Sequence, residues 1–251
     1  MYEMIHALLA DQKGGVIFQC LSIWHILYLL VIFGVIALVI ALFRGKNAAQ
    51  RKKVVDISIC CAFGLYIADF FLMPFAYGAI DVEKLPFHVC TAMCVMCFLS
   101  RKNAFLGRWR IQFAVLGLIS NLIYVLYPAG VGWHQIHPLS YRTWQTLLFH
   151  GAMTAHGMFV LVLGEEEWKL SYREPVVLVA MTLWALLGNT LYTGTAGDYM
   201  YDANWFFVKY DPFYLLPQDV APFCMPLIVF LAFWAATQVI YGLYSLYKKR
   251  R

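Results

Sequence analysis

Charged side chains are scarce in this sequence. Asp, Glu, Lys and Arg make up 13% of its 251 residues, whereas 62% are hydrophobic; a soluble domain has about 25% charged residues. The chain also lacks a polar segment the size of a soluble domain, and its apolar residues lie in runs of about 20, long enough to cross a hydrocarbon core of roughly 30 Å. These features exclude a water-soluble globular protein and predict a single membrane domain over residues 1–251.

Several motifs of enzymes and cofactor sites are also missing. The chain has no G-x-S-x-G, H-E-x-x-H or phosphate-binding loop. No lysine lies in the expected seventh span, which excludes a retinal Schiff base of the rhodopsin kind. The pattern C-x3-C-x2-C over Cys90–Cys97 lacks the usual spacing of a zinc or iron–sulfur site. We therefore expect no cofactor and no bound metal.

A disulfide scaffold and a cleavable leader are likewise not indicated. All of the seven cysteines except Cys20 fall within expected membrane segments, where a free thiol usually packs as a small hydrophobe. Residues 1–19 include Glu3, Asp11 and Lys13 and no long apolar run. We therefore expect no signal peptide and a retained first span.

The apolar runs predict an all-α polytopic membrane protein with seven transmembrane helices. The expected spans cover residues 20–43, 54–79, 87–100, 110–130, 143–164, 174–194 and 222–247. The connection at 195–221 is far longer than the others and rich in aromatic residues, which favours an outer aromatic cap or a re-entrant segment over a slack loop.

Basic residues predict the orientation of these spans. Five lie in "RGKNAAQRKK" (44–53), four in "SRKNAFLGRWR" (100–110) and four in the C-terminal "KKRR", and these segments alternate with connections poor in Lys and Arg. The positive-inside rule then places the N-terminus outside and the C-terminus in the cytoplasm of a cell-membrane protein. The net charge of +5 follows from this orientation and from anionic headgroups, and it indicates no nucleic-acid partner.

Polar side chains collect at a similar depth in the outer half of the predicted bundle, counted at ~1.5 Å per residue. The group comprises His25, Asp69, His88, Cys90, Cys94, His150, Asn189, Thr190, Thr193 and Cys224, with Asn121 near the midplane. His156 is deeper and Asp56 lies at the cytoplasmic edge. Because ionisable groups are costly inside a membrane, their clustering indicates a functional site.

A structural interpretation stands beside each functional one. Packing accounts for Cys94 and Cys97, and a hydrogen bond to a neighbouring helix would account for His150. Asp69 is either a pathway carboxylate or the partner of a histidine or tyrosine. His134 and His137 lie among aromatic residues typical of an interfacial belt rather than of a metal site.

A thiol and an imidazole that face each other form an activated nucleophile, which attacks ester carbonyls. Phospholipid esters lie at about the depth of Cys90 and His150, and Asn189 or a threonine could orient the histidine or stabilise an oxyanion. The residues therefore favour acyl transfer or hydrolysis on a membrane phospholipid. The alternatives are a transporter or receptor with an outer polar pocket for a small ligand, and a structural factor without chemistry.

Three short motifs resemble a known family: "LPFHVC" at the third span, "FHG" and "AHG" in the fifth, and "NTLYTGTAGDYMY" after the sixth. In these the chain resembles the YwaF-type bacterial integral membrane proteins, which are related to the eukaryotic transmembrane protein 164 family. Members commonly have Asn, then Gly-Thr, then Asn-Tyr-x-Tyr, whereas here Asp198 precedes Tyr199.

The resemblance implies a phospholipid acyltransferase with a membrane cysteine and histidine, similar also to the androgen-induced gene family of lipid hydrolases, which use threonine and histidine. It implies Cys90 as nucleophile and His150 as base, with His156 as the rival base. The full catalytic set that we expect is Cys90, His150, His88, Asn189 and His156, and the substrate site is expected to include Asp69, Cys94, Asn121, Thr193, Asp198 and Tyr199.

Overall fold

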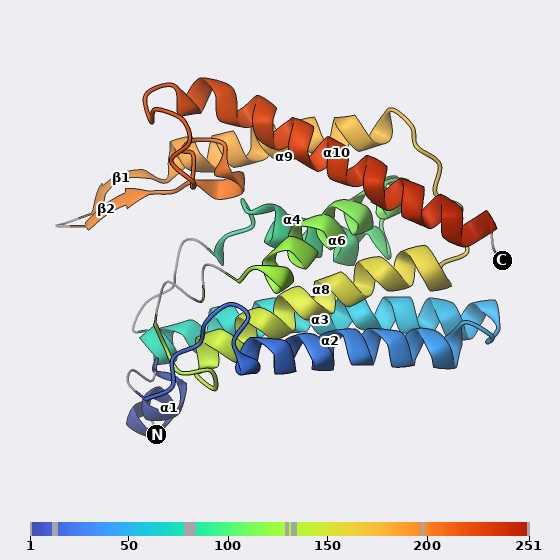
Figure 1. Cartoon of the computed structure of the whole chain (residues 1–251), viewed down its shortest axis with the longest axis horizontal. Coiled ribbons are helices and arrows are strands. Elements are labelled where there is room, and N and C mark those ends of the chain that lie inside the picture. Colours follow the sequence, from blue (N-terminus) through green and yellow to red (C-terminus); the bar gives the residue numbers. More distant parts are fainter. Residues whose placement is uncertain are drawn as a thin grey trace.

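A computed structural model of the chain describes residues 2–11, 15–77, 84–128, 131, 135–196 and 199–249. Most of these residues are helical (Figure 1). The helices are α1 (Tyr2–Leu9), α2 (Ile23–Phe43), α3 (Ala48–Tyr77), α4 (Val89–Ser100), α5 (Ala104–Gly107), α6 (Arg110–Leu126), α8 (Tyr141–Leu163), α9 (Arg173–Leu191), the short 3-10 helix η2 (Trp205–Phe207) and α10 (Ala221–Lys249).

Within the described ranges, five helices are long and apolar enough to cross a membrane: α2, α3, α8, α9 and α10. Their burial differs strongly, because 78% of the most apolar stretch of α8 is buried in the protein, against 11% for α2 and 17% for α10. A helix that is apolar all round and yet exposed is soluble only in lipid. The chain is therefore a multi-pass membrane protein, with α8 as its central helix and α2 and α10 facing lipid.

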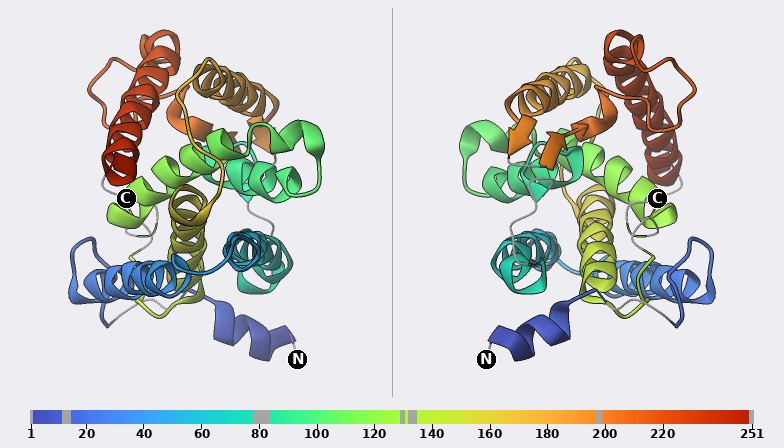
Figure 2. Two further views of the ribbon diagram at one scale, coloured as in Figure 1. Left: turned by 90° about the vertical axis from the view of Figure 1, so that its right-hand side faces the viewer. Right: turned by 90° about the vertical axis from the view of Figure 1, so that its left-hand side faces the viewer.

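The third and fourth predicted spans correspond to shorter apolar helices. α4 has 12 residues and α6 has 17, which at ~1.5 Å per residue gives roughly 18 and 26 Å. Both are largely buried, and Figure 2 shows them between α2 and α3 on one side and α9 and α10 on the other. The helices lie where the apolar runs predicted them, but α4 is too short to cross a bilayer of ordinary thickness by itself.

Two helix boundaries differ from the boundaries of the expected spans. α3 begins at Ala48 rather than at residue 54, because the Asn47 side chain accepts a hydrogen bond from the Gln50 N–H (2.9 Å) and so caps the helix six residues earlier. α9 ends at Leu191, and strands β1 (Thr193–Ala196) and β2 (Tyr199–Asp202) then pair antiparallel. This hairpin departs from the predicted all-α fold and places Thr193 beyond the sixth helix.

The two ends of the bundle differ in charge. Figure 1 shows the α2–α3 turn and the C-terminus at one end, and α1 with the β1–β2 hairpin at the other. We call the first end, with the Lys and Arg residues of 44–53, 100–110 and 248–249, the basic end. The opposite end is called the hairpin end.

Two glycines of α8 allow it to approach its neighbours closely. A Cβ at Gly157 would lie 2.5 Å from the Cβ of Leu118 on α6, and a Cβ at Gly151 would lie 2.8 Å from Ile32 on α2. Small residues at such crossings let helix backbones approach inside membranes. The two His-Gly pairs of the fifth span therefore have a packing role: Gly157 lets α6 approach α8, and Gly151 lets α2 approach it.

Candidate functional site

His150, on α8, and Asn121, on α6, form the centre of the candidate site. The His150 ring nitrogen Nδ1 lies 2.6 Å from Asn121 Oδ1. The amide of Asn121 is fixed by its other end, because Nδ2 donates to the Gly117 carbonyl (2.7 Å) and to Ser120 Oγ (3.3 Å). Since the amide oxygen can only accept, Nδ1 of His150 carries the hydrogen and Nε2 keeps the lone pair.

Aromatic rings hold the His150 imidazole in this orientation. Tyr124 stacks on it with ring centroids 3.9 Å apart, and Phe149 meets it edge-on at 5.1 Å. The residue is 8% exposed. His150 is therefore a buried, oriented imidazole with one basic nitrogen, which is the form required of a general base.

Cys90 lies at the start of α4, where the preceding segment is anchored to α9. Trp184 Nε1 donates to the Pro86 carbonyl (2.6 Å), and the Phe87 ring packs so closely on Gly188 that a Cβ there would lie 2.4 Å from it. Cys90 is half-buried, and the Ser120 side chain lies within interaction range of its thiol.

The structure thus brings Cys90 and His150 to adjacent residues of one helix, Ser120 and Asn121. In the part of the chain that the structure describes, no hydrogen bond joins the Cys90 thiol directly to the His150 ring. α6 is therefore the element that lies between these two residues.

A partly buried ion pair lies beside these residues, toward the hairpin end. The carboxylate of Asp69, which is 4% exposed, accepts a hydrogen bond from the Tyr141 hydroxyl (2.7 Å) and pairs with Lys84 Nζ (3.2 Å). Lys84 and His88 both lie within electrostatic range of His150. The Lys84 ammonium group therefore connects the Asp69 carboxylate electrostatically to His88 and His150.

His156 belongs to a different group. Its Nδ1 lies 3.0 Å from Ser58 Oγ on α3, and the charges that act on it are those of Arg110, Asp56 and Arg101. These residues lie toward the basic end. His156 is therefore nearer to that end than His150 along the axis of α8, and it lies apart from the predicted site. This position favours His150 over His156 as the base.

Asn189 has a structural role that the sequence did not reveal. Its Oδ1 accepts from the Trp205 N–H (2.8 Å) and its Nδ2 donates to the Trp205 carbonyl (3.3 Å). Asn189 therefore holds the connection after the hairpin against α9. The asparagine that contacts His150 is Asn121.

The remaining predicted residues are placed outside this group. Cys94 is fully buried in the main apolar core. Thr193 and Tyr199 belong to the hairpin, whose side chains, like the whole of Asp198, lie outside the described residues. His25 is a structural residue, because it accepts from the Leu21 N–H (3.0 Å) and its Nε2 lies 2.8 Å from the Val125 carbonyl.

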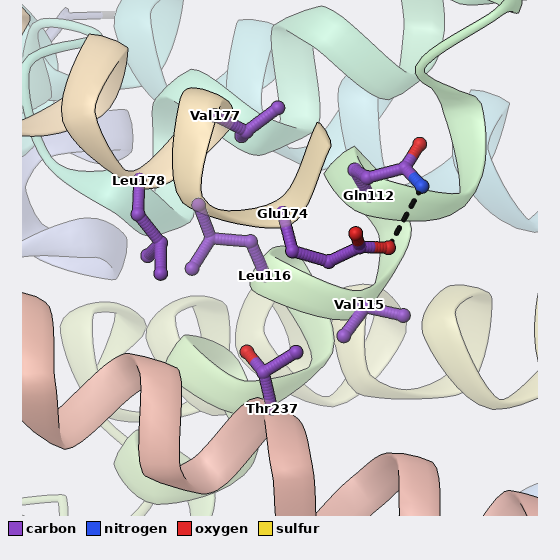
Figure 3. Close-up of a pocket in the computed structure, with 7 residues that line it drawn as sticks. All are labelled: Gln112, Val115, Leu116, Glu174, Val177, Leu178 and Thr237. Atoms are coloured by element: carbon purple, nitrogen blue, oxygen red, sulfur yellow. Dashed lines mark hydrogen bonds between the residues drawn. The ribbon is translucent and has the colours of Figure 1, made fainter. Parts of the chain in front are cut away.

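Glu174 is a buried acid that was not predicted from the sequence. Oε1 accepts from Gln112 Nε2 and Trp168 Nε1, both at 2.9 Å, and Oε2 accepts from the Ser171 N–H (2.8 Å) and hydroxyl (3.1 Å). Figure 3 shows the bond to Gln112 beside a cavity of about 10 Å³, which has room for at most about one water. The signal in the sequence was Ser171-x-x-Glu174, the capping box of a helix start.

These features define a class, the multi-pass helical membrane proteins with a buried polar site in the bundle. Among the described residues, no group of three or more His, Cys, Asp and Glu side chains could hold a metal ion. The chain matches the TMEM164 family over residues 20–247 and belongs to that family. No curated protein and no solved structure matches it. The match confirms the family relationship expected from the three motifs.

Proposed function

We propose that this chain is a phospholipid acyltransferase or lipid hydrolase that uses Cys90 as nucleophile and His150 as base. The observation that carries the proposal is the Ser120–Asn121 step of α6. The Ser120 side chain lies within interaction range of the Cys90 thiol, and Asn121 fixes the tautomer of His150. A nucleophile and a base whose orientation is set by a third group is the arrangement of covalent acyl-transfer enzymes.

The reaction would proceed through an acyl-enzyme. Nε2 of His150 takes the Cys90 proton, and the thiolate attacks the ester carbonyl carbon of a phospholipid. The C–O bond then breaks, and the proton passes from His150 to the leaving lysophospholipid oxygen. A second lysophospholipid or a water molecule attacks the thioester and restores the thiol, giving transfer or hydrolysis respectively.

Lys84 would hold the phosphate of the substrate. Its ammonium group is fixed by the buried Asp69 carboxylate at 3.2 Å and acts electrostatically on both His88 and His150. A cation in this position, toward the hairpin end, suits a headgroup whose acyl esters lie deeper in the bundle. The substrate would enter sideways from the leaflet at the hairpin end.

The proposal includes a topology. All seven predicted spans, α2, α3, α4, α6, α8, α9 and α10, would lie within the bilayer of a cell membrane, with α4 sheltered by its neighbours. The basic end would face the cytoplasm and the hairpin end the outside. The catalytic residues would then serve the outer leaflet.

The test is acyl exchange by purified protein in vesicles of phosphatidylethanolamine and phosphatidylcholine with a deuterated lysophospholipid, followed by mass spectrometry. We expect loss of exchange, by about 100-fold or more, in Cys90→Ala and in His150→Gln. The matched controls are Cys224→Ala, a half-buried thiol elsewhere, and His156→Gln. Undiminished exchange in Cys90→Ala would remove the nucleophile from the proposal.

A second candidate function is the binding or transport of a small polar ligand, favoured by the partly buried Asp69–Lys84 pair, whose ammonium group acts on two histidines. This function needs no thiol. It would be supported by saturable uptake into proteoliposomes that Asp69→Asn abolishes and Cys90→Ala leaves intact.

A further inference from the structure

Three cations converge on one carboxylate at the basic end of the bundle. Asp56, on α3, lies 2.7 Å from Lys52 Nζ, 3.4 Å from Arg110 Nη2 and 3.8 Å from Arg101 Nε. One negative charge cannot balance three positive ones, so this group has an excess of positive charge. It is far along the bundle from the proposed catalytic pair, and nothing in the proposed reaction uses it.

A cavity of about 400 Å³ opens beside these residues. It is lined by Ala49, Lys52, Lys53, Asp56, Ile57, Cys60 and Arg101. Its volume lies within the usual range for a small-molecule site, roughly 300–1,000 Å³. Its lining therefore carries three cations and a single acid.

The first turns of α3 form one wall of the cavity, since α3 begins at Ala48. The N-terminus of a helix has a partial positive charge and favours anions. The helix dipole and the lysines at positions 52 and 53 therefore act in the same direction. The wall attracts a group with negative charge.

Arg101 is held in place at the other wall. Its Nη1 donates to Cys60 Sγ (2.7 Å), and its guanidinium lies 5.3 Å from the centre of the Phe98 ring. Its Nε is buried and makes no hydrogen bond within the described residues; the Asp56 oxygen 3.8 Å away is beyond hydrogen-bonding distance. A guanidinium held in place beside the cavity is suited to bind phosphate oxygens.

The apolar surroundings indicate where the phosphate comes from. Ile57, which lines the cavity, is 50% exposed, and Cys61 on the same helix is also exposed. Such side chains meet lipid tails in a helix that crosses the membrane. An anion that occupies this cavity therefore has an apolar surface directly beside it, as an acyl chain requires.

We propose that this cavity binds the phosphate group of an anionic phospholipid from the leaflet at the basic end. Lys53 and Arg101 contact the phosphate, and Lys52 supplies further charge. The acyl chains run along the exposed face of α3 at Ile57. This lipid is separate from the substrate of the proposed reaction, and its binding does not depend on Cys90 or His150.

The test measures binding by the full-length protein in a neutral detergent. Dioctanoyl phosphatidylglycerol is titrated and followed by native mass spectrometry, with dioctanoyl phosphatidylcholine and inorganic phosphate as comparison ligands. We expect saturable binding of phosphatidylglycerol that Lys53→Gln weakens about fivefold, the effect of one basic residue near an anionic headgroup. Arg101→Gln should weaken binding by at least about tenfold.

Lys249→Gln is the matched control, because it removes the same charge from an exposed position of the basic end that does not line the cavity. Lys53 is also exposed, so its substitution leaves the fold intact even if that of Arg101 does not. Equal weakening by Lys53→Gln and Lys249→Gln, or equal binding of the two lipids, would overturn the proposal. Displacement of the lipid by an equal concentration of inorganic phosphate would assign the site to a soluble anion and would overturn it as well.

Discussion

At the scale of single residues, the two buried asparagines show what a sequence can and cannot specify. Asn121 and Asn189 are both polar residues in apolar spans, and the sequence favoured Asn189 as the partner of the histidine. The structure places Asn121 at 2.6 Å from His150 and Asn189 on the Trp205 backbone. Residue type predicts that each needs a partner, but only helix packing determines which partner lies opposite.

The first prediction separates these two roles. Asn121→Ala removes the acceptor that fixes the hydrogen on His150 Nδ1, so acyl exchange should fall roughly 10- to 100-fold as the wrong tautomer becomes populated. Asn189→Ala instead removes two hydrogen bonds to the Trp205 backbone. It should lower the free energy of unfolding by about 1–3 kcal/mol while exchange per folded molecule stays near wild type.

Exchange assays and thermal unfolding in the same detergent measure both quantities. The roles would be reversed if Asn189→Ala abolished exchange without loss of stability and Asn121→Ala left it unchanged.

At the scale of elements, α8 carries both a histidine of the candidate site and glycines that allow close helix packing. His150 faces α6, and the glycine that follows each histidine allows another helix to approach. The apolar periodicity of α8 predicted a helix, but it did not predict that the helix would be 78% buried over its most apolar stretch. The burial of α8 comes from helices that are distant from it in the sequence, so the local sequence does not predict it.

The second prediction concerns Gly157→Ala. The new Cβ would lie 2.5 Å from Leu118 Cβ and 2.9 Å from the Ala114 carbonyl oxygen, so α6 and α8 must separate. We expect a loss of about 1–3 kcal/mol in the free energy of unfolding and reduced exchange, because α6 holds Asn121. Gly64→Ala on α3 is the control, since no atom lies within 4 Å of its Cβ position; it should be neutral or stabilising by up to about 1 kcal/mol.

The third prediction concerns the connection before α10, where Asp211 accepts from three backbone N–H groups, those of Phe213 (2.9 Å), Leu215 (2.6 Å) and Leu216 (2.8 Å). These bonds hold the pKa of the Asp211 carboxyl below its usual value of 3.8. The ionised form therefore stabilises the turn. This stabilisation is fully present above the pKa that Asp211 has in the unfolded chain. It is lost as the pH falls through the lower pKa of the folded state.

Hydrogen-exchange protection at the Leu215 and Leu216 amides tests this dependence. Protection should be constant from neutral pH down to about pH 4 and should fall below it. Asp211→Asn should show the low-protection state at neutral pH and no titration. An unchanged protection profile in that variant would contradict the assignment.

At the scale of the whole molecule, the sequence predicted the positions of the helices better than their roles. Long apolar runs located α2, α3, α8, α9 and α10 because a bilayer requires that length. The hairpin at 193–202 was missed, since its residues continue the polar and aromatic pattern of the connection and contain no separate strand signal. For the candidate site, the sequence predicted a similar depth for Cys90 and His150, whereas the α6 residues between them could be identified only from the fold.

The last prediction tests the orientation of the molecule. In Figure 1 α1 and the C-terminus lie at opposite ends of the bundle, as an odd number of crossings requires. Met4 is 71% exposed and Lys249 is exposed at the end of α10. In a Cys20→Ser background, Met4→Cys should react with a membrane-impermeant maleimide on intact cells, whereas Lys249→Cys should react only after permeabilisation.

The four possible results lead to different conclusions. The expected pattern places the basic end in the cytoplasm, in agreement with the positive-inside rule, and assigns Cys90 and His150 to the outer leaflet. The inverse pattern would move the proposed catalytic pair to the inner leaflet and the proposed phosphate site to the outer one. Labelling of both positions, or of neither, on intact cells would require an even number of crossings, and one of the two short helices α4 and α6 would then not span the bilayer.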